Sequence, residues 1–244
     1  MRGTECRIFI SQYDFSAVTS GFSVETTVGE IESATLTSTV ADYAPAMNGG
    51  AINIEGYFYN PAPTGEEGVL YATLGDPNKI VAAIFDYQNL PASAYVIEGA
   101  YNNAMSWSAP SDGLIQMSGA FRGADGLKRG KLMQYKTART ATGAGAAVRL
   151  VGTLTSHVGR MIVFVHSTAG TQTSPLTLKI QSSANGTSGW ADEASFSFAS
   201  PAPGAQGADL ATPVGEYFNV NITSMGGLTS ATISFILTVN GLTT

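Results

Sequence analysis

The chain has 244 residues, enough for one large all-β domain or two ordinary domains, and only 12% of the residues are charged. A net charge of −6 argues against a protein that grips nucleic-acid phosphates with a basic patch, but not against a passage through which DNA slides without sticking. The single cysteine, Cys6, excludes an intrachain disulfide and a cysteine-based zinc site.

We expect no signal peptide, because the N-terminus lacks a long apolar core, and no membrane span, because no apolar run is long enough. The sequence therefore predicts a protein that is made and kept in a cytoplasm until assembly. Abundant small and hydroxyl residues with few charges are typical of β proteins with extensive buried interfaces. An ordinary monomeric sandwich with a neutral surface is the alternative.

The first part of the chain predicts antiparallel strands. A short apolar strand is expected at residues 7–11, followed by two segments that alternate between apolar and polar residues, Phe22 to Thr37 and Ala51 to Tyr59. Ile52 and Ile54 fall on one face of the second segment and the polar residues between them on the other. Alternation with a period of two indicates half-buried strands.

The connection between these two strands, Ser38 to Gly50, alternates with neither of them. Pro45 cannot donate to a strand ladder, and Asn48-Gly49-Gly50 is able to supply the positive φ angles of a tight turn. Two residues suffice to close a hairpin, so a loop of about a dozen residues is predicted to be functional. An ordered arm of this length on a sheet is able to reach a neighbouring subunit.

Residues in this region carry a resemblance to a known family. The matching segments are Thr35 to Thr39, Asp42-Tyr43-Ala44-Pro45, Gly49-Gly50 and Ile52-Asn53-Ile54-Glu55-Gly56. Their order resembles that of the tail tube proteins of long-tailed, siphovirus-like bacteriophages, over residues 5–136. The resemblance implies a sandwich-like fold whose sheets join across subunits into rings, usually hexameric, which stack into a conduit for DNA ejection. It also implies a place in the virion tail.

The resemblance further implies roles for individual residues. The loop is expected to make the inter-ring or inter-subunit contact, with Tyr43 as its buried anchor; the candidate residues are Ser38, Asp42, Tyr43, Pro45 and Asn48. Strand acids are expected to face the lumen, where like charge repels the DNA backbone. The lumen candidates are Glu25, Glu30, Glu32 and Glu55. An ordinary solvated strand face is the alternative for these acids.

One short helix, at about residues 66–75, is predicted to interrupt the strands. Thr64 is expected to be its N-cap, with Glu67 completing a capping box, and Gly75-Asp76-Pro77 is expected to end it. Tail tube proteins have a helix at about this place. Further strands are predicted at Lys79 to Asp86, Ala92 to Asn102, Asn103 to Ser108 and Leu114 to Arg122.

A change of composition predicts two domains. Residues 137–147 offer little to pack and include two glycines, so we expect a linker at 139–147 between a tail tube domain, 1–138, and an outer β-sandwich, 148–244. The strands expected in the second domain are Val148 to Thr155, Arg160 to Ser167, Leu176 to Ser182, Ala194 to Ala199, Glu216 to Thr223 and Ala231 to Val239. The predicted fold is therefore all-β, with a tail-tube-type sandwich followed by a second antiparallel sandwich.

The sequence offers no chemistry for catalysis. His157 and His166 are the only histidines, and no acidic residue keeps a metal-ligand spacing with them. The chain has no Walker loop, no Gly-x-Ser-x-Gly and no dinucleotide fingerprint. We therefore expect no enzyme activity, no cofactor and no metal.

Half of the basic residues fall between Arg122 and Arg139. One interpretation is an arm that meets acidic groups on the next subunit; a flexible, solvated interdomain segment and a DNA-binding patch are the others. The basic interface candidates are Arg122, Lys128, Arg129 and Lys131.

The expected function is that of a self-assembling tail tube subunit. Its expected partners are further copies of itself and, from the resemblance, the tape measure, tail terminator and distal tail proteins, while DNA passes without sequence-specific binding and no membrane is involved. The alternative is a capsid or tail decoration protein, or a module that binds carbohydrate on a host surface. Trp190, Trp107 and Tyr217 are candidates for stacking there, although such aromatics are more often core residues.

Overall fold

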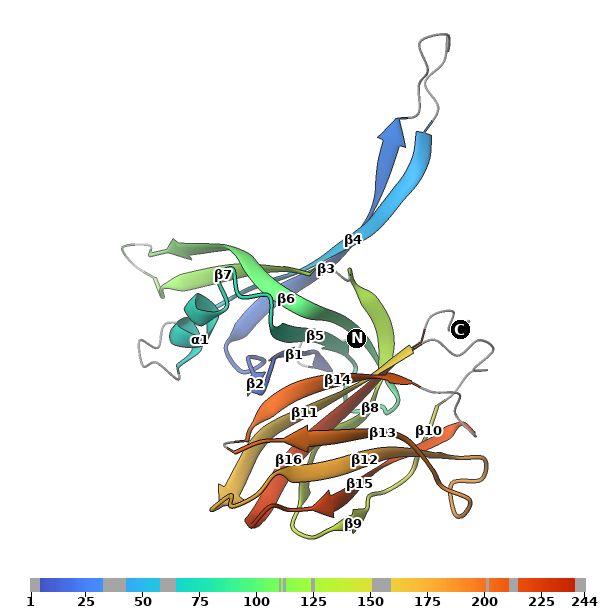
Figure 1. Cartoon of the computed structure of the whole chain (residues 1–244). Helices are drawn as coiled ribbons and strands as arrows, with labels where there is room; N and C mark the ends of the chain where they lie inside the picture. The colour runs from blue at the N-terminus through green and yellow to red at the C-terminus, as the bar shows by residue number, and fades with distance from the viewer. Residues whose placement is uncertain are drawn as a thin grey trace. The chain divides into compact units, whose positions relative to one another are not determined.

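The computed structural model of the chain describes residues 5–32, 43–57, 65–109, 111, 113–123, 126–150, 159–200, 202–210 and 215–239. Within these residues the chain forms sixteen strands and one helix, and the strands pair in antiparallel register (Figure 1). The prediction of an all-β fold with a single short helix is confirmed. The described residues contain no helix that is long and apolar enough to cross a membrane.

The chain forms two compact units, and neither is a continuous segment. The first comprises Met1–Ala17, Lys79–Val96 and Lys128–Thr244, and the second comprises Val18–Asn78 and Ile97–Leu127. Strand β6 (Ala92–Ser108) runs through both units. The predicted boundary at 138–148 therefore falls inside the first unit.

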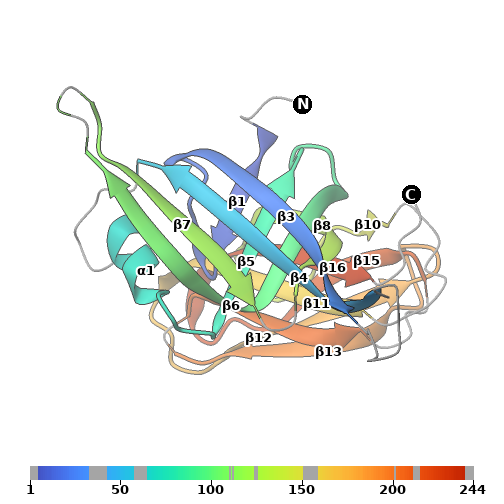
Figure 2. The same cartoon turned by 90° about the horizontal axis from the view of Figure 1, so that it is seen from above.

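The first unit contains two sheets. Its larger sheet has the order β14-β11-β16-β8-β6-β5-β1-β2, and its smaller sheet has the order β10-β15-β12-β13, with β9 also paired to β15 (Figures 1 and 2). The strands of the larger sheet are β1 Arg7–Ile10, β2 Tyr13–Asp14, β5 Lys79–Phe85, the start of β6, β8 Lys128–Arg139, β11 Gly159–Gly170, β14 Gly204–Leu210 and β16 Leu228–Val239. Those of the smaller sheet are β9 Gly143–Ala144, β10 Val148–Arg149, β12 Leu176–Ser183, β13 Ala191–Phe198 and β15 Tyr217–Ser224.

Strand β11 contributes to both hydrophobic cores of the first unit. Its residues Met161 to Val165 are all apolar and fully buried, which is the pattern of a strand covered on both faces. Val163 belongs to the core shared with the smaller sheet, whereas Phe164 belongs to a second core that includes Phe9. Residues before and after the predicted linker therefore share one hydrophobic core.

The predicted linker is itself paired. Strand β8 continues to Arg139 and pairs with β16, and Gly143–Ala144 pairs with β15. Sequence patterns did not predict β8, because its charges obscure the alternation. It lies between β6 and β16 in the sheet, so the interpretation of the Arg122 to Arg139 segment as flexible is wrong for residues 128–139.

The second unit is a four-stranded sheet in the order β3-β4-β7-β6, with one helix. Its elements are β3 Thr19–Glu32, β4 Tyr43–Gly56, α1 Glu66–Ala72, the second part of β6, and β7 Gln116–Gly123. One face of the sheet buries Ile52, Ile54 and Phe121. In the helix, Val69 and Leu70 are buried, while Leu74 just beyond it is 38% exposed.

Two local predictions for this unit need correction. The N-cap of the helix is Gly65, which makes no side-chain cap hydrogen bond, and Thr64 lies outside the described residues. The two strands predicted on either side of residue 102 are one strand with a register shift. The shift is stabilised by the Asn102 side chain, whose Oδ1 accepts hydrogen bonds from the backbone N–H groups of Ala104 and Ala120 at 3.4 and 3.2 Å.

The long predicted loop is mostly strand. Residues Tyr43 to Gly50 belong to β4 and pair with β3, and Gly49 and Gly50 pair with Thr27 and Thr26 instead of forming a turn. Pro45 is accommodated opposite Glu30, next to a register shift. The Asn48-Gly49-Gly50 segment was interpreted as a turn because glycine allows a positive φ, yet here glycine serves close packing.

Candidate functional site

The second unit presents an open, polar sheet face. Antiparallel pairing places the residues of three rows side by side across the four strands. We call these residues the polar face: Gly21, Ser23, Glu25, Ala51, Asn53, Glu55, Tyr101, Ala104, Ser106, Ser118, Ala120 and Arg122. Most of them are small, and those of the two rows from Gly21 to Ser106 and from Ser23 to Ala104 line an open groove of about 480 Å³.

Hydrogen bonds between neighbouring strands hold the side chains of the polar face in place. The amide nitrogen of Asn53 donates to Ser23 Oγ at 3.1 Å and to Glu25 Oε1 at 2.9 Å. The hydroxyl groups of Ser106 and Ser118 lie 2.8 Å apart. These contacts make the face a pre-arranged surface rather than a set of free side chains.

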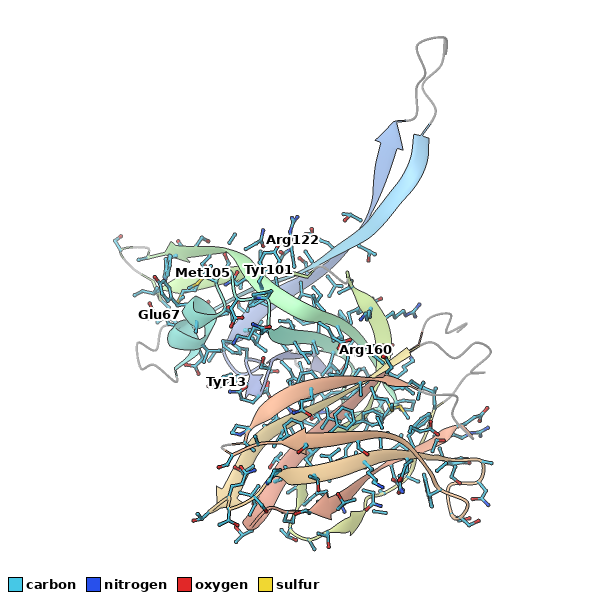
Figure 3. The ribbon with its side chains drawn as sticks, viewed as in Figure 1. Tyr13, Glu67, Tyr101, Met105, Arg122 and Arg160 are labelled. Carbon is cyan, nitrogen blue, oxygen red and sulfur yellow. The ribbon has the colours of Figure 1, made fainter. Side chains whose placement is uncertain are left out.

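The charges of the polar face lie in a defined order. Glu25 and Arg122 are both opposite Ala51, so one acidic and one basic side chain flank the same residue on one face. Tyr101 pairs with Arg122 from the next strand, and Figure 3 shows both side chains on this sheet. Glu55 follows two rows away, opposite Gly21 and Ser118. The face therefore carries two carboxylates and one guanidinium.

The polar face carries hydroxyl, amide, carboxylate and guanidinium groups. It contains no histidine, cysteine or lysine, and the described residues include no group of three or more His, Cys, Asp or Glu able to hold a metal ion. The Asn53 amide and the hydroxyl groups of Ser23, Ser106 and Ser118 make hydrogen bonds within the face. Such a face is suited to lie against a partner or a solvated channel.

The predicted contact loop is only partly described. Ser38 and Asp42 lie outside the described residues. Tyr43, Pro45 and Asn48 are in β4, opposite Glu32, Glu30 and Val28, and their side chains lie outside the described part of the structure. The role of these residues in an inter-subunit contact stays a prediction.

The four acidic lumen candidates divide into two pairs. Glu25 and Glu55 are on the polar face, and both are exposed. Glu30 and Glu32 are in the outer part of β3, beyond a register shift between Val28 and Glu30, and their side chains are outside those described. The structure therefore brings two of the four candidates together.

The basic candidates are also separated. Arg122 is on the polar face of the second unit, whereas Lys128, Arg129 and Lys131 begin β8 in the first unit. Lys131 donates to Ser93 Oγ at 3.2 Å, and Arg129 is exposed. The sequence cluster does not form one basic patch on one strand. A role in a subunit interface stays a prediction, both for Arg122 in the second unit and for the three residues of β8 in the first unit.

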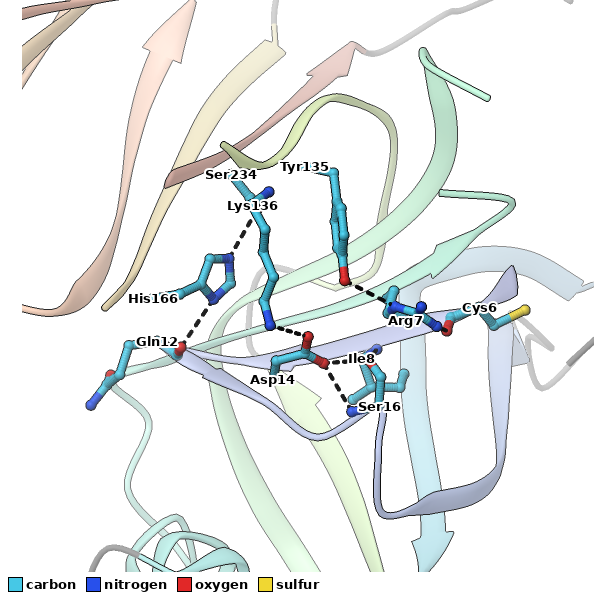
Figure 4. A network of polar contacts seen from close by, with 10 residues as sticks. All are labelled: Cys6, Arg7, Ile8, Gln12, Asp14, Ser16, Tyr135, Lys136, His166 and Ser234. Atoms are coloured by element: carbon cyan, nitrogen blue, oxygen red, sulfur yellow. Dashed lines mark hydrogen bonds and ion pairs between the residues drawn. The ribbon is translucent and has the colours of Figure 1, made fainter. Parts of the chain in front are cut away.

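His166 is a half-buried structural residue of the first unit (Figure 4). His166 Nδ1–H donates to the Gln12 carbonyl at 3.0 Å, and Nε2 accepts from the Ser234 hydroxyl at 2.9 Å. Burial lowers the pKa of His166 to about 4. Nearby, the Lys136 ammonium lies 2.6 Å from Asp14. Both ring nitrogens of this imidazole are occupied, so it is not placed to act as a base on an outside substrate.

Comparison with known proteins gives distant likenesses. No protein-family model and no curated protein matches the chain. Among solved structures, the chain is similar to a component of the virion of a native gene transfer agent particle, with 12% identity, a TM-score of 0.38 and coverage of 53% of this chain and 98% of that one. It is similar to the tail tube of phage SPP1, with 10% identity, a TM-score of 0.41 and coverage of 55% and 81%.

A third likeness spans nearly the whole chain. The SPP1 Dit protein, described as a hub adsorption apparatus of phages that infect Gram-positive hosts, covers 97% of this chain and 99% of its own, with 8% identity and a TM-score of 0.33. At TM-scores below 0.5 these likenesses carry no argument about fold or function.

Sequence reasoning missed the place of Arg122 on the polar face. The signal was present, because residues 116, 118, 120 and 122 alternate with the apolar or small residues of β7. Parity within this strand groups Arg122 with Ser118, and pairing with β4 then groups it with Glu55 and Glu25. Grouping Arg122 with Glu55 and Glu25 requires the register between the strands, and the sequence alone does not supply that register.

Proposed function

We propose that this protein is the tail tube subunit of a siphovirus-like bacteriophage. In this proposal the subunits form rings, usually of six, which stack into a conduit for DNA ejection. The family resemblance of residues 5–136 motivates the proposal. The observation that carries it is the β3–β4 hairpin, because this element is longer than the sheet to which it belongs.

Among the described strands, none pairs with the outer half of the hairpin as a third strand. Each strand has 14 residues, but β4 pairs with β7 only from Ala51 to Gly56. Residues Tyr43 to Gly50 have β3 as their only strand partner in the described part of the chain, and the ribbon extends beyond the sheet in Figure 1. A two-stranded hairpin is marginally stable in water by itself. A neighbouring subunit that packs on the ribbon would stabilise it.

The sheet edge supports lateral assembly. Strand β3 pairs only with β4 among the described strands, so one side of a 14-residue strand lies at the edge of the sheet. A long open edge is a template for pairing with another chain. In the proposed ring this edge joins the sheet of the next subunit, and the polar faces of all subunits form one continuous inner surface.

The polar face supports the role of a lumen wall. Its small Gly, Ser and Ala side chains leave a smooth surface, and Glu25 and Glu55 outnumber the single base, Arg122. Clusters of Lys or Arg side chains bind the phosphate backbone of DNA, and the affinity depends strongly on salt concentration. A face with more carboxylates than guanidinium groups does not bind the phosphates of DNA that passes along it.

Electron microscopy of the purified protein tests the proposal. We expect rings or tubes from the unmodified chain, and a folded subunit that does not polymerise from the Tyr43→Ala variant, because it removes the expected anchor of the hairpin. Tyr71→Ala is the matched control, since Tyr71 is 65% exposed on α1. A chain that remains a monomer or trimer under all conditions would instead favour a decoration protein. Normal tubes from Tyr43→Ala would exclude the hairpin contact.

A further inference from the structure

The first unit contains a pocket that the tube proposal does not use. It has a volume of about 370 Å³ and lies between strand β8, residues 144–148 and Leu90. Leu90, Met133 and Val148 make part of its wall apolar. Gln134, Thr137 and Arg139 contribute the polar side chains. An apolar wall with a few converging polar groups is the usual composition of a small-ligand site.

Gln134 is the first sign that this pocket binds a ligand. The residue is only 9% exposed, and its amide nitrogen has no hydrogen-bond partner in the described part of the chain. Buried polar groups are nearly always paired, because an unpaired one loses its hydration without compensation. Rotation of the terminal amide by 180° exchanges its oxygen and nitrogen, so the side chain is able to offer either a donor or an acceptor to the pocket.

Arg139 is the second sign. Its Nη2 donates to the Gly143 carbonyl at 2.6 Å and its Nη1 to the Val220 carbonyl at 3.2 Å. Within the residues that the structure describes, no carboxylate pairs with this half-buried guanidinium. Two of its five N–H donors are thus used to hold the group in position, and the others remain for an anion.

Gly145 keeps this arrangement open. A Cβ at residue 145 would lie 2.5 Å from Arg139 Nη1 and 3.2 Å from the Val220 carbonyl oxygen. Any side chain there would push against the guanidinium that reaches Val220. The glycine therefore allows the backbone of the pocket wall to approach the arginine closely.

We propose that this pocket binds a carboxylate that is joined to a compact apolar body with an amide beside it, which is the chemistry of a peptide C-terminus. Arg139 pairs with the carboxylate, Gln134 makes hydrogen bonds with the amide, and the apolar side chain lies against Leu90, Met133 and Val148. A free N-acyl amino acid and the C-terminal residue of a protein supply the same groups.

Binding of N-acetyl-leucine to the full chain, followed by calorimetry and by NMR shifts of the amide groups of residues 133–148, tests the proposal. The neutral analogue N-acetyl-leucinamide is the matched ligand control. We expect the acid to bind and the amide to bind at least tenfold more weakly. Equal affinity of the two would overturn the assignment of Arg139 as the anion site.

Gln134→Leu separates binding from folding. Removal of an unpaired buried amide is expected to raise Tm, while loss of the hydrogen-bonding group is expected to weaken N-acetyl-leucine binding at least fivefold. Gln181→Leu is the control, because Gln181 is in β12 of the smaller sheet and donates to Asp192. Unchanged affinity in Gln134→Leu would contradict the proposal.

A peptide that ends in the same leucine distinguishes the two sources of the ligand. Tighter binding of an eight-residue peptide than of N-acetyl-leucine supports the pocket and indicates a protein C-terminus. Weaker binding supports the pocket and indicates a free acid. Absence of binding for every carboxylate probe would overturn the proposal as a whole.

Discussion

Gly50 of β4 lies directly against Leu127, so that a Cβ at residue 50 would be 2.3 Å from Leu127 Cβ. Real Cβ atoms do not approach so closely. The contact joins the β3–β4 hairpin, at the residue just before β4 begins to pair with β7, to the last residue of the second unit. Gly50, which the sequence pattern predicts to be a turn residue, is therefore a packing residue.

Gly50→Ala is expected to destabilise the protein, because the added methyl group overlaps the Leu127 side chain. Overpacking of this kind costs about 1–3 kcal/mol of unfolding free energy. Chemical denaturation measures the loss. Gly204→Ala is the control, since a Cβ there would meet only Phe198 ring carbons at 3.6 and 3.8 Å, in ordinary contact. Equal stability of the two variants would mean that the hairpin moves to accept the methyl group.

A size-selective label tests whether the polar face lines the lumen. In a Cys6→Ser background, Ser106→Cys is expected to react with a small maleimide in both free subunits and tubes. A maleimide carrying a large polymer is expected to react with free subunits and to be excluded from tubes. Thr223→Cys is the control, because Thr223 is exposed on β15 of the smaller sheet.

The labelling experiment also has a clear contrary outcome. If the large reagent labels residue 106 equally fast in tubes and in free subunits, the polar face is on the outside of the assembly. The assignment of Glu25 and Glu55 to the lumen would then be wrong, since both share this face with Ser106.

Acid is expected to destabilise the first unit through His166. Burial lowers its pKa to about 4 from the ordinary value of 6.5, and the Lys136 ammonium acts in the same direction, partly opposed by Asp14 and by the hydrogen bond to Gln12. The unfolded chain therefore takes up a proton at a higher pH than the folded chain. Stability is complete above pH 6.5 and falls as the pH drops to about 4, by about 3 kcal/mol in total.

Asp14 affects the stability of the first unit in a lower pH range than His166. Burial raises the pKa of Asp14, but hydrogen bonds from Lys136 and Ser16 outweigh it, so that the net shift is downward from 3.8. Its contribution is present above that value and is lost as the pH falls through the folded pKa. Denaturation curves of His166→Gln should therefore lose the slope between pH 6.5 and 4, whereas those of His157→Gln should retain it. A persistent slope in His166→Gln would assign the pH dependence to another group.

Gln206 protects an edge of the smaller sheet. Its amide nitrogen donates to the Ser197 carbonyl at 2.7 Å, and its amide oxygen accepts from the Ser197 N–H at 3.3 Å. The side chain therefore makes the two backbone hydrogen bonds that a neighbouring strand would make with Ser197 of β13. Gln206→Ala should cost about 1–2 kcal/mol and expose an unpaired strand edge. Denaturation and light scattering on concentration measure both effects. Gln88→Ala, at an exposed residue with one hydrogen bond of 3.4 Å, should change neither.

Local patterns predicted most of the strands. Alternating residues correctly predicted β5, β11, β12, β13, β15 and β16 in approximate position, because each buries apolar side chains with a period of two or in a continuous run. Strand β14 was not predicted, since GAQGADL is poor in β-branched and aromatic residues. It forms because seven of its residues pair with β11. Pairing, and not local preference, creates this strand.

The sequence by itself determined the fold class, the absence of familiar catalytic motifs and the acidic, weakly charged surface. These properties depend on residue identity and on neighbours along the chain. The tertiary structure alone decided which residues share a face and which segments share a core. Glu25 and Arg122 come onto the same face through two strand registers, and Phe9 and Phe164 pack together with ring centroids 5.4 Å apart although 154 residues separate them. Long-range pairing sets both relationships, and no local pattern encodes it.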